Sequence, residues 1–189
     1  MKFRAGGVIR TYNVKGMKVV FRWPKMSDAA DLARYVNRLS LERPPMITRT
    51  SPKMTAEKEK KYLKRMFKAM GEGKVACPLV EVDGKVAALT HAKKLYPNSR
   101  ILKHQVEIGV GLDKNYRGLG IGHLIMEVLE EVSVKCLKAK VIVLWHAEYN
   151  KVARGLYEKH GFRETGRIPK AIRHKGKYYD EVLMCKVLV

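Results

Sequence analysis

The chain has 189 residues, of which 46% are hydrophobic, enough for one domain with a sizeable core. It carries 39 Lys and Arg against 18 Asp and Glu, and the formal net charge of +21 predicts attraction to polyanions such as nucleic acid or the ribosome. No apolar run approaches the roughly 18 residues of a membrane span, and the basic beginning lacks the apolar stretch of a signal peptide, so we expect a cytoplasmic protein with no membrane partner.

The first third of the chain predicts a strand followed by two helices. Residues 1–17 are basic and rich in glycine, and we expect a short strand or a loose arm ahead of a single domain over 18–189. Residues 18–23 are typical of a strand. Ser27 and Asp28 can cap a helix that runs to about residue 41, and a loop begins at residues 43–45. Thr55 caps a second helix, which Gly71 and Gly73 close.

The remainder of the chain alternates strands with helices. Asp83-Gly84 supplies the positive φ angles of a tight turn and predicts a hairpin of residues 75–82 with 85–95. An uninterrupted apolar run at 141–145 indicates a strand buried on both faces. The other expected elements are strands at 101–112 and 178–189 and helices at 121–132 and 150–161. This order predicts a mixed α/β domain.

The most informative local feature is the sequence Arg117-Gly118-Leu119-Gly120-Ile121-Gly122. It lies between a predicted strand and a long amphipathic helix. A glycine turn at a helix start presents unpaired N–H groups in front of a positive helix dipole, a site that favours a diphosphate. A dinucleotide-binding fold would have this turn after its first strand. A P-loop would have Lys and then Ser or Thr after the last glycine, where this chain has His123 and Leu124. Glycines that only permit close packing are the remaining alternative.

Two segments resemble the GNAT superfamily of acyl-CoA-dependent N-acyltransferases. The family signature is Gln or Arg, two residues, Gly, one residue, then Gly or Ala, and Arg117, Gly120 and Gly122 match it. Residues 150–162 resemble the second motif, a helix that runs to Gly-Phe. The resemblance covers residues 18–189 and implies a GNAT fold: a mostly antiparallel central sheet that is splayed between its fourth and fifth strands and flanked by about four helices.

The resemblance also implies acetyl-CoA as the cosubstrate, with no metal. Backbone amides of the glycine turn would bind its diphosphate, namely those of Arg117, Gly118, Leu119, Gly120, Ile121 and Gly122. Pantetheine would lie between the splayed strands and pair with Val110, Gly111 and Leu112, and Asn150 would contact the cofactor arm. Gly109 and Gly111 hint at a bulge in this strand.

For catalysis, the resemblance implies Tyr157 as the general acid that protonates the leaving thiolate. Its alternative role is an aromatic residue on the apolar face of its helix. Glu107, directly before the cofactor strand, matches a catalytic glutamate of several protein-acetylating relatives. Glu148, His146 and ordered water stay open as alternatives for the general base.

Substrate choice in this family depends on regions that are basic in this chain: residues 43–54, the helix 55–70 and residues 167–179. A polyamine site would gather carboxylates, so the leading hypothesis is a protein amine acceptor, an N-terminus or a lysine, on a ribosomal or nucleic-acid-associated protein. The alternatives are a small-molecule amine or polyamine acetyltransferase, and a non-catalytic acetyl-CoA-sensing nucleic-acid-binding protein. A monomer and a homodimer are equally compatible with the sequence.

Overall fold

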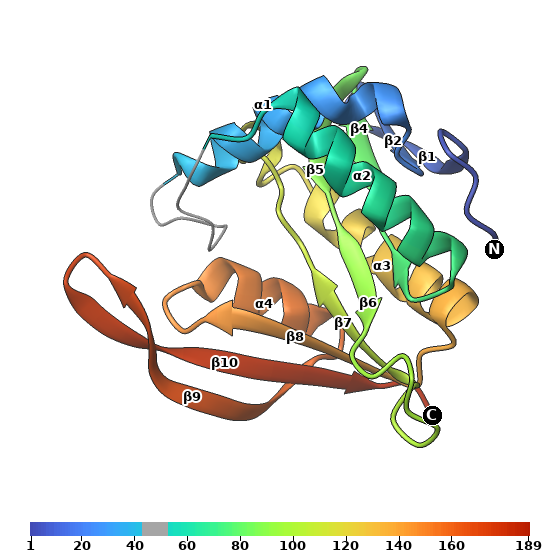
Figure 1. The fold of residues 1–189 in the computed structure, drawn as a ribbon. Coiled ribbons are helices and arrows are strands. Elements are labelled where there is room, and N and C mark those ends of the chain that lie inside the picture. Colours follow the sequence, from blue (N-terminus) through green and yellow to red (C-terminus); the bar gives the residue numbers. More distant parts are fainter. Residues whose placement is uncertain (43–52) are drawn as a thin grey trace.

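The computed structural model describes residues 1–42 and 53–189, which form ten strands, four α-helices and two short 3-10 helices (Figure 1). The predicted loop at 43–45 lies outside the described residues. In chain order the elements are β1 Val8–Val14, β2 Met17–Arg22, η1 Met26–Asp28, α1 Ala29–Ser40, α2 Ala56–Gly71, β3 Val75–Ala76, β4 Leu79–Val82, β5 Lys85–Leu89, β6 His91–Lys94, β7 Gln105–Gly109, η2 Lys114–Tyr116, α3 Ile121–Leu137, β8 Val141–Ala147, α4 Lys151–Lys159, β9 Arg163–His174 and β10 Lys177–Val187.

The strands form two sheets. One has the order β1-β2-β4-β5 and the other β3-β6-β7-β8-β10-β9. All recorded pairs are antiparallel except β7 with β8. Of the two possibilities for residues 1–17, the structure shows a strand and not a loose arm, because Val8–Val14 pairs with β2.

The hairpin predicted over 75–95 is broken in both arms, so the prediction of two continuous strands is wrong. Pro78 lacks an N–H and interrupts the first arm, and Thr90 interrupts the second. The backbone N–H and the hydroxyl of Thr90 both donate to the Pro78 carbonyl, each at 2.9 Å. As a result β4 and β5 belong to one sheet, while β3 and β6 belong to the other.

The splay between β7 and β8 is the feature that creates the site. These are the fourth and fifth strands of the predicted set, and they pair only at Gln105–Val141, Val106–Ile142 and Glu107–Val143. Beyond Glu107 the two strands part. β7 is shorter than predicted, because residues 101–104 form turns and the N–H of Leu102 donates to the Ser99 hydroxyl at 3.1 Å.

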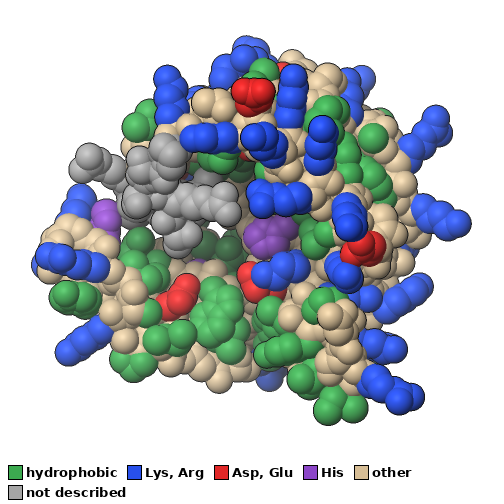
Figure 2. Space-filling view, in the orientation of Figure 1, with side chains coloured by type: hydrophobic (Ala, Val, Ile, Leu, Met, Phe, Trp, Pro, Cys, Tyr) green, Lys and Arg blue, Asp and Glu red, His purple; other side chains and the backbone are tan. Residues whose placement is uncertain are grey.

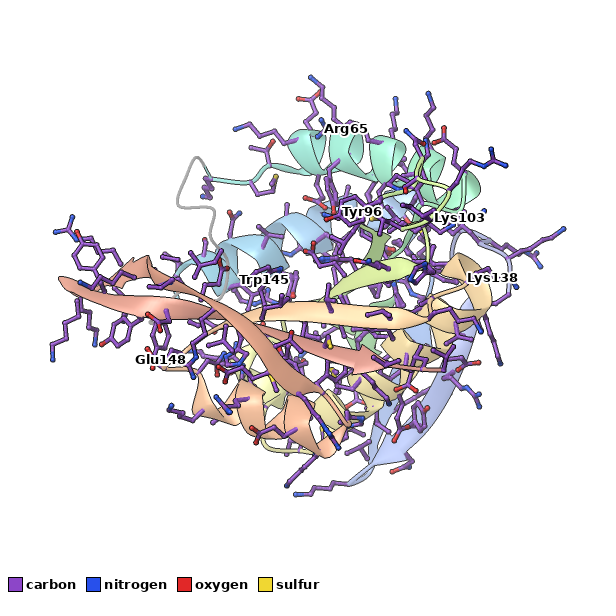
Figure 3. The ribbon with its side chains drawn as sticks, turned by 90° about the horizontal axis from the view of Figure 1, so that it is seen from below. Arg65, Tyr96, Lys103, Lys138, Trp145 and Glu148 are labelled. Atoms are coloured by element: carbon purple, nitrogen blue, oxygen red, sulfur yellow. The ribbon has the colours of Figure 1, made fainter. Side chains whose placement is uncertain are left out.

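The helices cover both sides of the strands. Figure 3 shows α1 and α2 on one side and α3 and α4 on the other. α1 packs on α2 and β5, and α3 packs on β6 and β7. The core between them is apolar, with Leu32, Leu39, Leu79, Ile125 and Leu129 among its fully buried side chains.

The two predicted helix caps behave differently. The Thr55 hydroxyl accepts a hydrogen bond from the Lys58 N–H at 3.3 Å, as expected for a capping residue. Asp28 is the residue before α1 but makes no cap bond. Its carboxylate accepts two bonds from the Arg22 guanidinium, at 2.7 and 2.8 Å, in a buried ion pair, and it also accepts from the Lys25 N–H at 2.7 Å at the start of η1.

Strand β9 was not among the elements predicted from the sequence. It lies at the sheet edge, where Pro169 is tolerated, and a register shift follows at Lys170, whose φ is 53°. Within residues 1–42 and 53–189, none of the helices has the length and apolar character needed to cross a bilayer. The same residues contain no group of three His, Cys, Asp or Glu side chains that could hold a metal ion.

Candidate active site

The glycine turn forms an open cradle at the start of α3. Gly118 and Gly120 have φ angles of 73° and 88°, and no atom lies within 4 Å of a Cβ added to either. No side-chain hydrogen bond from Gly120 caps α3; in its first turn the His123 N–H donates to the Gly120 carbonyl at 3.0 Å. Gly122 has a different role, because its added Cβ would lie 3.3 Å from Leu156 of α4. The backbone at Gly118 and Gly120 is therefore open to close approach, while the last glycine of the turn permits α3 and α4 to pack.

Helix α1 holds the segment that leads to this turn. The buried Tyr35 hydroxyl donates to the Gly111 carbonyl, and burial raises the pKa of this phenol. Arg117 turns back on its own segment and donates to the Leu112 carbonyl from Nε at 2.9 Å and from a terminal nitrogen at 2.6 Å. The same guanidinium pairs with Glu42 at 2.5 Å. The side chain of Arg117 thus holds the turn in position through contacts within the protein.

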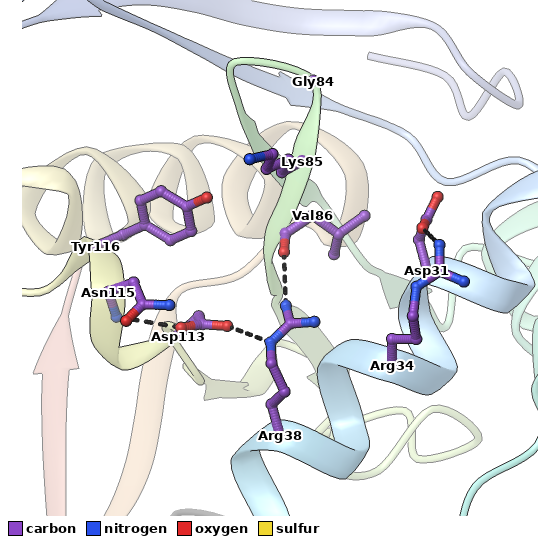
Figure 4. Close-up of a pocket in the computed structure, with 9 residues that line it drawn as sticks. All are labelled: Asp31, Arg34, Arg38, Gly84, Lys85, Val86, Asp113, Asn115 and Tyr116. Atoms are coloured by element: carbon purple, nitrogen blue, oxygen red, sulfur yellow. Dashed lines mark hydrogen bonds and ion pairs between the residues drawn. The ribbon is translucent and has the colours of Figure 1, made fainter.

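A second contact from α1 lies beside a surface cavity of about 450 Å³ (Figure 4). Arg38 donates to Asp113 at 2.8 Å, and Asp113 is 3% exposed at its side chain. Asp113 also accepts from the N–H of Asn115 at 3.1 Å, which fixes η2 directly before the glycine turn. The cavity includes neither Tyr157 nor Glu107, so we interpret it as part of the support for the turn.

Tyr157 lies on the α3–α4 side of the sheet, near the splay. Its side chain is 8% exposed, and burial raises the pKa of its phenol to about 12. Its ring is 5.9 Å from that of His146 on β8. The Nδ1 of His146 lies 2.9 Å from the Ala147 carbonyl, whereas its buried Nε2 has no hydrogen-bond partner among the described residues.

Glu107 lies on the opposite face of the sheet, at the last position where β7 pairs with β8. Its carboxylate is 3.6 Å from the Lys93 ammonium and 4.0 Å from the His91 imidazole. The interactions with His91 and Lys93 hold the pKa of Glu107 below its usual range, despite partial burial. A tyrosine that keeps its proton and an ionised carboxylate therefore flank the splay from its two sides.

A family model described as the acetyltransferase (GNAT) family matches residues 41–162. The chain belongs to this family. YwnH of Bacillus subtilis (strain 168), named as a candidate phosphinothricin acetyltransferase, is 31% identical over 102 residues, 52% of this chain and 59% of that protein. The uncharacterized N-acetyltransferase MJ1530 of Methanocaldococcus jannaschii is 30% identical over 112 residues, 57% of this chain and 64% of that protein. The chain thus spans about three fifths of the length of these curated relatives.

Solved structures agree with the GNAT assignment at the level of the fold. A ribosomal-protein-S5-alanine acetyltransferase from Vibrio fischeri superposes with a TM-score of 0.80 at 21% identity, covering 95% of this chain and 97% of that one. The predicted GNAT fold, with its splayed and mostly antiparallel sheet, is confirmed.

The GNAT fold brings the predicted site residues to one region. The glycine turn, Val110, Glu107 and Tyr157 all lie around the splay or directly after it. Asn150 is the residue before α4, and its side chain accepts from the Ala153 N–H at 3.2 Å, so it also caps this helix. The carbonyls of Gly111 and Leu112 already accept hydrogen bonds, from Tyr35 of α1 and from Arg117 respectively. Of the segment expected to pair with pantetheine, Val110 therefore has the backbone least engaged in other hydrogen bonds.

The sequence analysis did not single out His91, which lies against Gly109 and 4.0 Å from Glu107, and it misinterpreted Gly109 and Gly111. β6 and β7 pair without a register shift as far as Gly109, and the next bridge, Ala88 with Leu112, leaves two residues on each side, so the bulge expected at Gly109 and Gly111 is not formed. Gly109 instead makes room for the imidazole of His91, and Gly111 for Tyr35. An isolated glycine at a strand end was the only available signal for these close approaches.

Proposed function

We propose that the protein is an N-acetyltransferase that transfers the acetyl group of acetyl-CoA to a primary amine within a ternary complex. The observation that carries this proposal is the splay between β7 and β8, with an uncapped glycine turn at one end and Tyr157 and Glu107 on its two faces. An anion cradle and two proton-handling groups at one opening in a sheet fit an acyl donor that carries a diphosphate.

The residues of the turn fit acetyl-CoA. The open space outside Gly118 and Gly120 lets a phosphate approach the backbone amides, and the dipole of the 17-residue helix α3 favours the negative charge. We expect Val110 and Asn150 to contact the pantetheine arm. When bound, acetyl-CoA supplies an acetyl thioester whose carbonyl carbon is open to attack by an amine.

The side chains near the splay supply the proton chemistry of the proposed reaction. With a pKa of about 12, Tyr157 holds its proton until a thiolate is released and then gives it up to the sulfur. Glu107 lies on the other face, where the amine would approach, and its negative charge favours an ammonium group there. The expected result is direct attack in a ternary complex, with no acyl group on the protein.

We propose a protein amine as the acceptor. The solvent face of α2 carries six exposed cations that form no salt bridge with another described residue: Lys58, Lys60, Lys61, Lys64, Arg65 and Lys68. Figure 2 shows Lys and Arg side chains gathered over α2, beside a hollow in this face of the molecule. Such a surface fits association with nucleic acid or with a ribosome, which would present a protein terminus or a lysine to the site.

Two alternatives remain specific enough to test. The name of the Bacillus subtilis relative supports a small-molecule amine acceptor. The basic surface on α2 also fits a non-catalytic, acetyl-CoA-sensing protein that binds nucleic acid. We propose that the protein acts in the cytoplasm, as a monomer or a homodimer.

The deciding experiment transfers label from acetyl-CoA into a heat-inactivated extract of the source cell and then separates proteins from small molecules. Label in protein bands that disappears with Tyr157→Phe supports the protein acceptor. Label confined to small molecules refutes that acceptor. Binding of acetyl-CoA with no label in either fraction refutes catalysis and favours the sensing alternative.

Association with nucleic acid is tested separately by the salt dependence of RNA binding. Replacing Lys60, Lys64 and Lys68 by Gln should reduce the slope of log affinity against log salt by about two to three. The control variant replaces Lys135, Lys138 and Lys140, on the far side of the sheet, by Gln. An equal reduction by both variants would refute a specific surface on α2.

A further inference from the structure

His91 is the first residue of β6, and its imidazole lies across Gly109 of the neighbouring strand. A Cβ built on Gly109 would come 2.1 Å from Cε1, 2.7 Å from Nε2 and 2.8 Å from Nδ1 of that ring. The two residues are direct partners in the β6–β7 ladder. Because only glycine leaves this space, the ring lies over a part of β7 that has already separated from β8.

Three side chains near the splay share one face of the sheet. Lys93 is the direct partner of Glu107, and His91 is two residues before Lys93, so all three point the same way. Strand alternation puts Trp145 of β8 on this face, and Figure 3 shows Trp145 between the strands and α1. Tyr157 is on the other face. An amine that approaches from the α1 side would therefore meet His91 and Glu107 first.

Glu107 is better suited to hold a cation than to remove a proton. Its carboxylate is within 4.0 Å of His91 Nε2 and 3.6 Å of Lys93 Nζ, and these two interactions keep its pKa low. A carboxylate that binds a proton weakly takes one from an amine with little driving force. An imidazole is the side chain best matched to accept a proton near neutral pH.

We propose that His91 is the general base of the acetyl transfer, and that Glu107 orients its ring and balances the charge that the ring gains. This inference rests on the proposed function, because it names the group that takes the amine proton in that reaction. With Nε2 directed at Glu107, Nδ1 is the nitrogen left to accept the proton. The side chain is 43% exposed, so the proton can pass on to water.

The step balances in atoms and charge. Nδ1 of His91 takes one proton from the acceptor ammonium, and the freed lone pair forms the C–N bond to the acetyl carbon. The C–S bond breaks, and Tyr157 gives its proton to the departing sulfur. The second amine proton restores Tyr157 through solvent. One acetyl group has moved, and His91 releases one proton to water.

The other base candidates lie on the opposite face of the sheet or are paired with other groups. His146 is on the opposite face, where its Nδ1 lies 2.9 Å from the Ala147 carbonyl and its buried Nε2 has no partner among the described residues. Glu148 accepts from Arg167 at 3.3 Å and from the backbone N–H of Asp180 at 3.4 Å. In the described part of the chain, the imidazole on β6 is thus the proton acceptor that faces the side from which the amine would come.

The test compares His91→Asn with the matched control His104→Asn. His104 lies just before β7, and its hydrogen bonds to the described residues are made by its backbone carbonyl, which accepts from Lys140 and Val141. The rate of thiol release from acetyl-CoA is measured from about pH 6 to 9, with heat-inactivated source-cell extract as the acceptor. We expect His91→Asn to lower the rate about 10²-fold or more, and the remaining rate to rise only at higher pH, where amines lose protons unaided. Acetyl-CoA affinity, read by calorimetry, should stay within about twofold in both variants.

A second readout does not depend on transfer. Nitrogen NMR should find the neutral His91 ring with its proton on Nε2, and Glu107→Gln should abolish that preference. A wild-type rate in His91→Asn, an equal loss in the His104 control, or a tautomer that ignores Glu107→Gln would each overturn the inference. A wild-type protein that transfers nothing, yet has the expected tautomer, refutes the proposed function and leaves the pairing intact.

Discussion

The sharpest consequence of the site geometry concerns Gly109→Ala, a change of one methyl group. The added Cβ would lie 2.1 Å from Cε1 of His91, whereas two carbon atoms in contact prefer about 3.5 Å. The ring must therefore retreat by roughly 1.4 Å, the difference between these distances. A displacement of that size at a proton-transfer group costs about 10²-fold in rate.

The same substitution should hardly affect folding. Gly109 is not among the residues with a positive φ, so alanine fits its backbone. The displaced ring is 43% exposed and can swing into solvent, and the free energy of unfolding should change by less than about 1 kcal/mol. Loss of activity without loss of stability would distinguish a displaced base from a damaged sheet.

The assay is a double-mutant cycle of Gly109→Ala and His91→Asn, followed by transfer rate and by urea unfolding. If the alanine acts through the ring, the double variant should be no slower than His91→Asn alone. Gly155→Ala is the matched control, because no atom lies within 4 Å of an added Cβ and the site is in a helix, where alanine is favoured. A wild-type rate in Gly109→Ala, or losses that simply add, would refute the reasoning.

Three further changes test other parts of the site. Tyr157→Phe should lower turnover about 10²-fold at neutral pH with acetyl-CoA affinity kept. Burial raises the pKa of Tyr157 to about 12, so the phenol ionises at lower pH in the unfolded chain than in the folded protein. Melting curves should therefore show that the stability of the wild-type protein falls between about pH 10 and 12. The Phe variant should not show this decrease. Arg38→Ala leaves the buried Asp113 carboxylate without its cation. Because Arg38 is half exposed, we expect the free energy of unfolding in urea to fall by about 1–2 kcal/mol, and acetyl-CoA binding to weaken. The control, Arg34→Ala, removes an exposed ion pair and should cost under about 0.5 kcal/mol. His146→Phe removes a buried nitrogen that has no partner in the described residues, so the melting temperature should hold or rise and transfer should persist; inactivity with a normal fold would restore His146 as the base.

Elements with a complete local signal could be predicted from the sequence. Thr55 caps α2 because its hydroxyl needs only the N–H three residues later. The glycine turn and α3 were equally local, since positive φ angles at Gly118 and Gly120 and the apolar spacing after them belong to one short segment. The splay followed from the family resemblance, and no local pattern encodes it.

Elements that depend on distant partners could not be predicted in the same way. The breaks at Pro78 and Thr90 arise because these residues bond to each other where one hairpin is shared by two sheets. Asp28 was predicted to cap the helix over α1, but its carboxylate accepts from the Lys25 N–H at the start of η1 and from Arg22, and no local pattern marks Arg22 as its partner.

The candidate site shows the same division. The positive φ angles of the turn follow from its own glycines, and the anion-binding role of its amides stays a prediction; the position of the Arg117 side chain depends on Glu42, 75 residues away. His91 escaped notice because nothing nearby in the sequence marks it. Only the register of β6 against β7 brings it over Gly109 and next to Glu107.

The parting of β7 from β8 leaves two open edges in the interior of a sheet. Ile108 and Gly109 pair only with β6, and residues 144–147 pair only with β10. Exposed edges of this kind recruit foreign strands, and proteins normally keep them short or covered. A ligand with an amide-bearing arm would complete the sheet as a substitute strand, and its free energy of binding would add to that of folding. The empty protein would then be the form most open to aggregation, and the supply of acyl donor would set its lifetime as well as its turnover.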